Sequence, residues 1–303
     1  MPHTPYDHSA RDAAIAINSY TTVLKRPQVP HEVFAAYWRD VHGPLCSRVP
    51  GLAWYVQYHL DREQDAHLWP ARDGIAPFPD YVLDGGVEIG FADAADQATF
   101  NEASSILFSD EQNVFAATVA YALPQGSRTL VDRIAEPNPN GNDAFDRMHV
   151  HFGPGGKDPE AFAAFMVTFA ETLAADPALL RVRLHLPDAY DNADPAPPAP
   201  EVAHDVPPER ERLAILDLAF ATPLARRRFF ASDAFTRTVD RQERHIGYAT
   251  AFAVSGMYTY VRDKALTLAG LRGSRPAQLI ERLGADNQTA ENVRHLMFTV
   301  KLD

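Results

Sequence analysis

The chain has a single cysteine, Cys46, in 303 residues. One thiol excludes an intramolecular disulfide framework and a thiolate metal site. The neighbouring His-Gly-Pro bend leaves two roles open for Cys46, a small buried hydrophobe or a nucleophile. We expect the buried role.

Long hydrophobic runs are also absent, because no window approaches eighteen consecutive apolar residues. The sequence therefore predicts no membrane-spanning helix, and its first fourteen residues lack the apolar segment of a secretory signal. The net charge is −12, without a run of five like charges. This balance argues against nucleic acid or an anionic membrane as a partner. We expect a cytoplasmic protein.

The usual cofactor fingerprints are missing as well. The chain has no GxGxxG placed after a strand, no Walker A loop, no HExxH and no GxSxG. The stretch 153–156 (GPGG) superficially suggests a phosphate loop, but the Lys-Ser/Thr that should follow is absent, so a plain turn is expected. We predict no cofactor. What the chain does contain is histidine, twelve in all, several of them on predicted strands.

The stretch 24–60 holds the densest cluster of aromatic, histidine and charged side chains. Pro30 is suited to the start of a helix. One apolar helix face follows, formed at three- and four-residue spacing by Val33, Phe34, Tyr37, Trp38, Val41 and Leu45. Gly43-Pro44 is expected to end or sharply bend that helix, and 52–60 reads as a strand.

The string FAAYWRDVHGPL, followed by VPGL, resembles the signature of the EthD-like branch of the dimeric α+β barrel proteins. Its positions run from Tyr37 to Leu45, and the match covers roughly residues 15–60. The resemblance implies a ferredoxin-like α+β fold and places His42 beside the cavity. It leaves the activity open, because relatives of this fold include isomerases, cyclases, lyases, monooxygenases and haem enzymes.

Two halves of the chain repeat one order of elements, β-α-β, a Pro-rich loop, then β-α-β. In the first half we expect strands at 13–23, 52–60, 86–91 and 120–132 (broken at 124–126), helices at 30–45, 93–107 and 109–118, and an insertion or lid at 61–84. In the second half we expect strands at 147–152, 179–186, 212–221 and 255–261, helices at 158–174 and 223–248, and a loop at 187–210.

This order predicts two ferredoxin-like β-α-β-β-α-β units in tandem, residues 1–134 and 144–263. In the resembled family such units pair face to face, so one chain could form the whole two-sheet barrel as a pseudo-dimer. The C-terminal tail, 264–303, is expected to hold one or two short helices and a strand or extended arm at 293–302. An arm that packs on a second copy would give a homodimer.

Alternation on the second-half strands gathers polar side chains on one face. That set is His149, His151, Arg181, Arg183 and His185, which we expect to face the barrel interior. The corresponding first-half set is expected to be Asn18, Tyr20, Tyr55, Gln57 and His59. Structural hydrogen bonds, a small-molecule pocket and a metal or haem site all remain open for these residues. Two arginines would repel a cation, so no metal is expected.

His42 is the first candidate for general acid or base, although a helix-terminal histidine bonded to backbone fits the same position. Tyr20 could donate a hydrogen bond to a substrate oxygen or a forming enolate, or it could be a packed tyrosine. The remaining catalytic candidates are His149, His151 and His185. Candidates for substrate binding are Arg183, for a carboxylate or phenolate, together with Tyr55, His59, Trp38 and His245.

These residues favour a cofactor-independent lyase or isomerase that acts on an aromatic or phenolic small molecule by histidine-mediated proton transfer. One alternative is a non-enzymatic ligand-binding or stress-associated barrel. A second is a cofactor-free or haem-dependent oxygenase.

Overall fold

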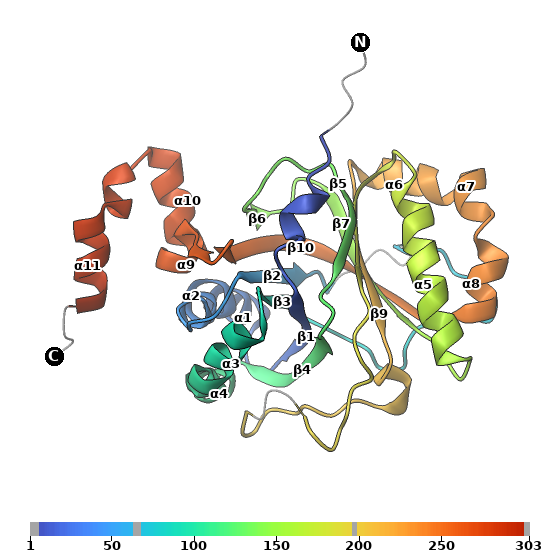
Figure 1. The fold of residues 1–303 in the computed structure, drawn as a ribbon, viewed down its shortest axis with the longest axis horizontal. Helices are drawn as coiled ribbons and strands as arrows, with labels where there is room; N and C mark the ends of the chain where they lie inside the picture. Colours follow the sequence, from blue (N-terminus) through green and yellow to red (C-terminus); the bar gives the residue numbers. More distant parts are fainter. Residues whose placement is uncertain (1–5, 63–67, 196–198, 300–303) are drawn as a thin grey trace, which may run out of the picture.

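The computed structural model describes residues 6–62, 68–195 and 199–299. Its strands join one large sheet whose named strand pairs are antiparallel, and helices pack against both halves of it (Figure 1). The protein therefore has a mixed α+β fold. The strand order is β4-β1-β3-β2-β10-β7-β9-β8-β5.

The first half contributes the segment β4-β1-β3-β2 of this order. Its strands are β1 (Ile17–Lys25), β2 (Trp54–Leu60), β3 (Gly85–Phe91) and β4 (Phe115–Leu123). Its helices are η1 (Ser9–Asp12), α1 (His31–Tyr37), η2 (Trp38–His42), α2 (Gly43–Ser47), α3 (Ala94–Ala103) and α4 (Ser105–Glu111). The helix predicted at 109–118 is wrong beyond Glu111, because Phe115 and the β-favouring residues after it pair with β1 instead.

The second half contributes the segment β10-β7-β9-β8, which is the same order counted within its own strands. These strands are β7 (Asp146–Gly153), β8 (Leu179–His185), β9 (Ala214–Phe220) and β10 (Tyr248–Arg262). The helices are α5 (Pro159–Ala174), η3 (Pro208–Arg210), α6 (Pro223–Phe230), α7 (Asp233–Thr236) and α8 (Val239–His245).

The last strand of each half pairs with a strand of the other half. β10 pairs with β7 over Tyr248–Ala253 and then with β2 of the first half over Val254–Arg262. Beyond the turn at 124–127, the chain that forms β4 continues as β5 (Arg128–Asp132), which pairs with β8. The prediction of a strand only at 255–261 was therefore too short. Residues 249–254 were assigned to no element, and their pairing with β7 and the start of β2 makes them part of the strand.

The two Pro-rich segments also cross between halves. Trp69 contacts Phe152, Phe230 and Phe235 of the second half, so this side chain anchors the insertion predicted at 61–84 to the second-half core. In the other direction, Ala203 forms a bridge with Ala117 on β4. Residues 63–67 and 196–198 lie outside the described part of the chain.

The C-terminal tail projects from the body (Figure 1). It contains α9 (Leu268–Arg272), α10 (Ser274–Leu283), η4 (Asp286–Thr289) and α11 (Glu291–Thr299). The strand predicted at 293–302 is wrong as far as Thr299, where the chain is helical, and residues 300–303 are outside the described part. Two short strands, β6 (Asn140–Asn142) and β11 (Ala265–Leu266), pair with β10. The expected contact of the tail with a second copy stays a prediction.

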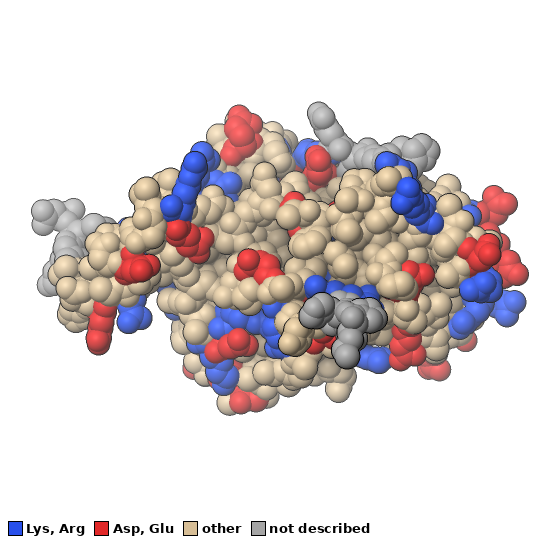
Figure 2. Space-filling model, turned by 90° about the horizontal axis from the view of Figure 1, so that it is seen from above, with Lys and Arg blue, Asp and Glu red and all other residues tan. Residues whose placement is uncertain are grey.

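Acidic and basic side chains are intermixed over the face shown in Figure 2. None of the described helices combines the length and the apolar composition needed to cross a membrane.

Candidate active site

A cavity of about 740 Å³ lies between the first-half sheet and the helices that cover it. This volume falls in the range of small-molecule sites. Strands β1, β3 and β4 form one side, and η2, α2, α3 and α4 form the other. Much of the wall is aromatic, from Trp38, Tyr55, Phe91, Phe100, Phe108 and Phe115.

His42 reaches this cavity from a π-helical turn, η2. The N–H of Gly43 bonds to the carbonyl of Trp38 rather than to that of Arg39, and the Tyr260 hydroxyl donates to the freed Arg39 carbonyl at 2.8 Å. The helix therefore continues through Gly43-Pro44 in a different hydrogen-bond pattern, and the predicted break is wrong. π-Helical turns of this kind often occur at functional sites.

Glycine is required at position 43 by a close approach. A Cβ on Gly43 would lie 2.5 Å from Cζ of Tyr260, whose ring packs directly against the turn. Tyr260 thus both satisfies the freed carbonyl and fixes the path of the chain beside His42.

The side chain of His42 is oriented by a carboxylate. Its Nδ1 lies 2.8 Å from Oδ2 of Asp110, and the Tyr37 hydroxyl donates to Oδ1 of the same residue at 2.5 Å. Burial alone would raise the pKa of Asp110, but the hydrogen bonds from His42 and Tyr37 outweigh it and lower that pKa. An ionised Asp110 accepts a hydrogen bond from Nδ1–H, so in the neutral form of the imidazole Nε2 carries the lone pair.

His42 is 6% exposed, lines the cavity, and has no hydrogen-bond partner for Nε2 among the described residues. The alternative of a backbone-bonded, helix-terminal histidine does not describe this geometry, because its partner is a side chain. A neutral imidazole held from behind with its lone pair on a cavity wall has the arrangement of a general base.

Glu111 is a second titratable group on the same wall. Its Oε2 accepts a hydrogen bond from Thr118 Oγ1 at 3.2 Å, and its other oxygen has no partner among the described residues. Burial raises the pKa of Glu111, opposed by His42 and by the Thr118 hydrogen bond. The pKa values of these two neighbouring acids thus shift in opposite directions, downward for Asp110 and upward for Glu111.

Sequence reasoning missed Asp110 and Glu111, which fall at the start of the helix predicted at 109–118. Asp110 is 68 positions from His42, so no local spacing could join them. The nucleophile alternative for Cys46 has little chemical support, because burial raises the pKa of its thiol, which stays protonated.

The other predicted catalytic residues meet elsewhere, in a buried network between the two halves of the sheet. The Tyr20 hydroxyl lies 2.7 Å from Nδ1 of His149 and 3.1 Å from Nε2 of His151. His185 stacks near Tyr20, with ring centroids 5.1 Å apart. Burial lowers the pKa of His149 to about 4 and that of His185 to about 3, so these rings are neutral at physiological pH.

Arg183 belongs to the same network. Its guanidinium bonds to Glu88 at 2.8 Å and to Asp12 at 3.2 Å. Arg183, like the histidines around it, has no exposed surface. None of these side chains lines the cavity, and we do not propose them as catalytic.

The expected first-half interior set was partly wrong. Tyr20 on β1 and Val56 on β2 both pair with Glu88 on β3, so these three side chains lie on the same face of the sheet, toward the buried network. Tyr55 and His59 occupy the alternate positions of β2 and therefore face the helices. Tyr55 therefore lines the cavity, as does Trp38. His59 stacks on Trp38 with ring centroids 4.3 Å apart, one layer behind the wall.

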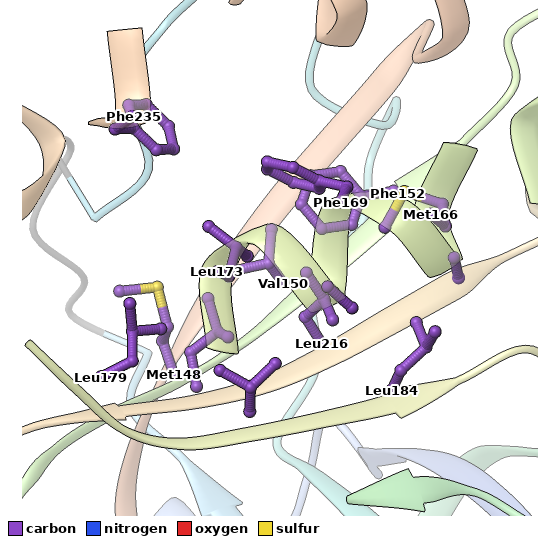
Figure 3. Close-up of a cluster of buried hydrophobic side chains, with 14 of the residues drawn as sticks. Met148, Val150, Phe152, Met166, Phe169, Leu173, Leu179, Leu184, Leu216 and Phe235 are labelled. Carbon is purple, nitrogen blue, oxygen red and sulfur yellow. The ribbon is translucent and has the colours of Figure 1, made fainter. Parts of the chain in front are cut away.

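The equivalent space in the second half is filled. Phe152, Met166, Phe169 and Leu216 interdigitate between α5 and the sheet, as Figure 3 shows. His245, a predicted substrate contact, stacks on Phe165 at the outer side of this cluster, with ring centroids 5.0 Å apart.

A comparison of the two halves of the sequence agrees with this difference between an open and a filled space. FAAYWRDVHGPL (34–45) aligns without gaps on FAAFMVTFAETL (162–173), and LFSDEQ (107–112) aligns on FASDAF (230–235). In these alignments Ala170 stands where His42 is, and Ala234 stands where Glu111 is. The second half therefore lacks side chains equivalent to His42 and Glu111, and it lacks the space beside them.

Among the described residues, no group of three or more His, Cys, Asp or Glu side chains is arranged to hold a metal ion.

No family model matches the chain, and no curated protein matches its sequence. Among solved structures it is similar to a candidate monooxygenase from Fusobacterium nucleatum, at 8% identity and a TM-score of 0.49, over 83% of this chain and 95% of that one. An anthrone oxidase-like protein matches at 11% identity and a TM-score of 0.46, over 84% and 96%. A mutant chlorite dismutase from Candidatus Nitrospira defluvii matches at 11% and 0.36, over 80% and 92%.

Proposed function

We propose that the protein is an enzyme that binds an aromatic or phenolic small molecule in the first-half cavity and removes a proton from it with His42. The observation that carries this proposal is the arrangement of His42 itself. Its Nδ1 is held by Asp110, and its Nε2 has no partner on the wall of a 740 Å³ cavity rich in aromatic side chains.

The fold proposed with it is a dimeric α+β barrel of the EthD-like branch, built within one chain from units 1–134 and 144–263, with 264–303 as a tail. The equal strand order of the two halves and the exchange of β10 and β5 between them support this pseudo-dimer. The EthD-like string supports the branch, because it contains the π-helical turn that presents His42.

The proposed chemistry is proton transfer without a cofactor. Nε2 takes a proton from an acidic C–H or O–H of the substrate, and Asp110 stabilises the imidazolium that forms. The electron pair left on the substrate becomes an enolate or phenolate beside that positive charge. Glu111, which burial inclines toward the protonated form, returns a proton to a different atom, giving an isomerisation, or to a departing group, giving an elimination.

Two other readings use the same cavity. A non-enzymatic binding protein would hold the aromatic ligand and transfer no proton. A cofactor-free oxygenase would share the first step and would show itself by oxygen uptake. A haem-dependent enzyme fits less well, because haem carries two carboxylates and no Lys or Arg among the described residues lines the cavity to pair with them.

The test is proton exchange with 2-tetralone, a neutral fused-ring ketone with acidic C–H groups. The protein in D₂O should accelerate deuterium incorporation next to the carbonyl, followed by NMR. His42→Gln should lower the protein-dependent rate by about 10²-fold or more. The matched control is His245→Gln, which removes a histidine of the second half and should leave the rate unchanged.

A blocking variant separates binding from chemistry. Ala120 lines the cavity from β4, so Ala120→Phe should reduce both binding of 2-tetralone and exchange. If 2-tetralone binds but exchange is equal in wild type and His42→Gln, the protein is a binding module and not this enzyme. If wild type consumes oxygen with the bound probe, the oxygenase reading replaces the isomerase.

A further inference from the structure

We infer that the substrate is uncharged: a neutral fused-ring phenol or ketone without a carboxylate, phosphate, sulfate or ammonium group. This inference rests on the proposed site. The chain contains 28 Lys and Arg residues, yet none of those in the described part lines the cavity. Recognition of carboxylate and phosphate groups in proteins ordinarily uses guanidinium or ammonium donors, and this wall presents neither.

The arginines that could bind an anion are occupied elsewhere. Arg183 is paired with Glu88 and Asp12, and Arg181 with Asp217, Asp132 and Asp12, all within the buried network. This network lies on the opposite face of the first-half sheet from the cavity. The expectation that Arg183 would hold a substrate carboxylate is therefore not part of this inference.

An anion in the cavity would also meet acidic neighbours. Glu111 and Asp194 line the wall, and Asp110 lies directly behind His42. A ligand carboxylate would lose its hydration in an apolar space and gain no cationic partner from the wall.

The acids do not make the cavity a cation site, because each one already accepts a hydrogen bond or is solvated by water. Asp110 accepts hydrogen bonds from His42 and Tyr37. Glu111 accepts one from Thr118, and burial favours its neutral form. Asp194 is exposed at the rim, where water solvates it. The cavity interior thus offers no unpaired fixed charge of either sign.

What it does offer suits a neutral aromatic molecule. The aromatic walls can pack against fused rings. The side-chain amide of Gln97 can hydrogen-bond a phenol or ketone oxygen, and the Ser104 hydroxyl, which donates to the Asn101 carbonyl, can accept a hydrogen bond from a phenol.

Neutrality also fits the proton chemistry. The positive charge that pairs with the substrate anion is the imidazolium of His42, and the reaction itself creates it. A carboxylate on the substrate would stabilise the protonated form of His42 before the reaction, and a protonated His42 cannot accept the substrate proton.

The experiment measures calorimetric binding of three matched probes at pH 7.5 to the full chain: 2-naphthol, 6-hydroxy-2-naphthoate and (6-hydroxynaphthalen-2-yl)methylammonium. We expect 2-naphthol to bind at least tenfold more tightly than either charged analogue. Asn101, an exposed residue of α3 on the cavity wall, provides the reciprocal test. Asn101→Arg should raise affinity for the naphthoate about tenfold and leave that for 2-naphthol nearly unchanged.

Thr99→Arg is the matched control, because it adds the same charge to an exposed position of the same helix that does not line the cavity. It should leave all three affinities unchanged. Equal or tighter binding of a charged probe to wild type overturns the neutral-substrate inference while leaving the aromatic site intact. Failure of all three probes to bind instead removes the aromatic site, and with it the proposed function.

Discussion

Nδ1 of His42 and Oδ2 of Asp110 lie 2.8 Å apart, although 68 positions separate the two residues in the chain. The π-helical turn η2 presents the imidazole, and the last turn of α4 presents the carboxylate. The contact therefore exists only when the helices of the first half are packed on their sheet. It fixes the tautomer in which Nε2 carries the lone pair at the cavity wall.

Replacing Asp110 by asparagine tests this relationship. Asp110→Asn keeps the shape but removes the charge that stabilises the imidazolium and selects the tautomer, so the His42-dependent exchange of 2-tetralone should fall by about 10²-fold or more. Asp40→Asn is the control, because Asp40 is closer to His42 in sequence but pairs with Arg39 and the backbone of Arg275. Equal rates in wild type and Asp110→Asn would remove Asp110 from the mechanism.

The close contact of Gly43 with Tyr260 predicts a stability effect at the same turn. Gly43→Ala places a Cβ 2.5 Å from Tyr260 Cζ, and such overpacking should lower the unfolding free energy by about 1–3 kcal/mol in urea titration. In a Tyr260→Ala background the clash is gone, so the same substitution should cost markedly less. An unchanged cost in that background would place the strain elsewhere.

The buried ion pairs of Arg183 predict a larger loss. Arg183→Met leaves Glu88 and Asp12 without this guanidinium in a site with no exposed surface. The unfolding free energy at pH 7.5 should fall by about 3–5 kcal/mol. The exposed pair of Arg128 and Glu171 is the control, since Arg128→Met should cost about 1 kcal/mol or less. Similar small losses for both would contradict a structural role for the network.

Much of the fold could be predicted from sequence, because its information is local. The alternating pattern of 179–185 and the capped amphipathic pattern of 159–174 correspond to β8 and α5. The errors lie where distant pairing decides. Tyr248–Val254 became strand through its contact with β7 and the start of the β2 pairing, and only the register with β3 showed which face of β2 turns inward.

The residues of the candidate site also divide into those that a local pattern predicts and those that only distant contacts reveal. His42 was predicted because its neighbouring residues carry a motif, and Tyr55 and Trp38 were predicted as substrate contacts. Asp110 and Glu111 were missed because their partners are distant in sequence. A gap-free comparison of the two halves would have singled out His42 and Glu111, since alanine replaces each in the half whose space is filled by phenylalanine.

The buried histidines make the folded protein sensitive to acid. In the folded chain the pKa of His149 is lowered to about 4, and those of His59 and His185 to about 3, with burial as the main cause. Above pH 6.5 these side chains are neutral in both the folded and the unfolded chain, so they add no pH dependence. Between pH 6.5 and about 4 the unfolded chain binds protons that the folded chain does not, so the unfolding free energy falls as the pH falls.

Each histidine should contribute a slope of about 1.4 kcal/mol per pH unit within that window. Urea titrations at pH 4.5, 5.0, 5.5 and 7.5 should therefore show a steep loss of stability well above the range in which ordinary carboxylates titrate. His185→Gln removes one proton-binding group from the unfolded chain, so the slope should drop by about 1.4 kcal/mol per unit even if the variant is less stable overall. His245→Gln is the comparison, because this histidine is only partly buried and should change the slope much less. A flat profile from pH 7.5 to 4.5 would mean that the network histidines bind protons in the folded state, and the neutral network described for the space between the two halves would be wrong.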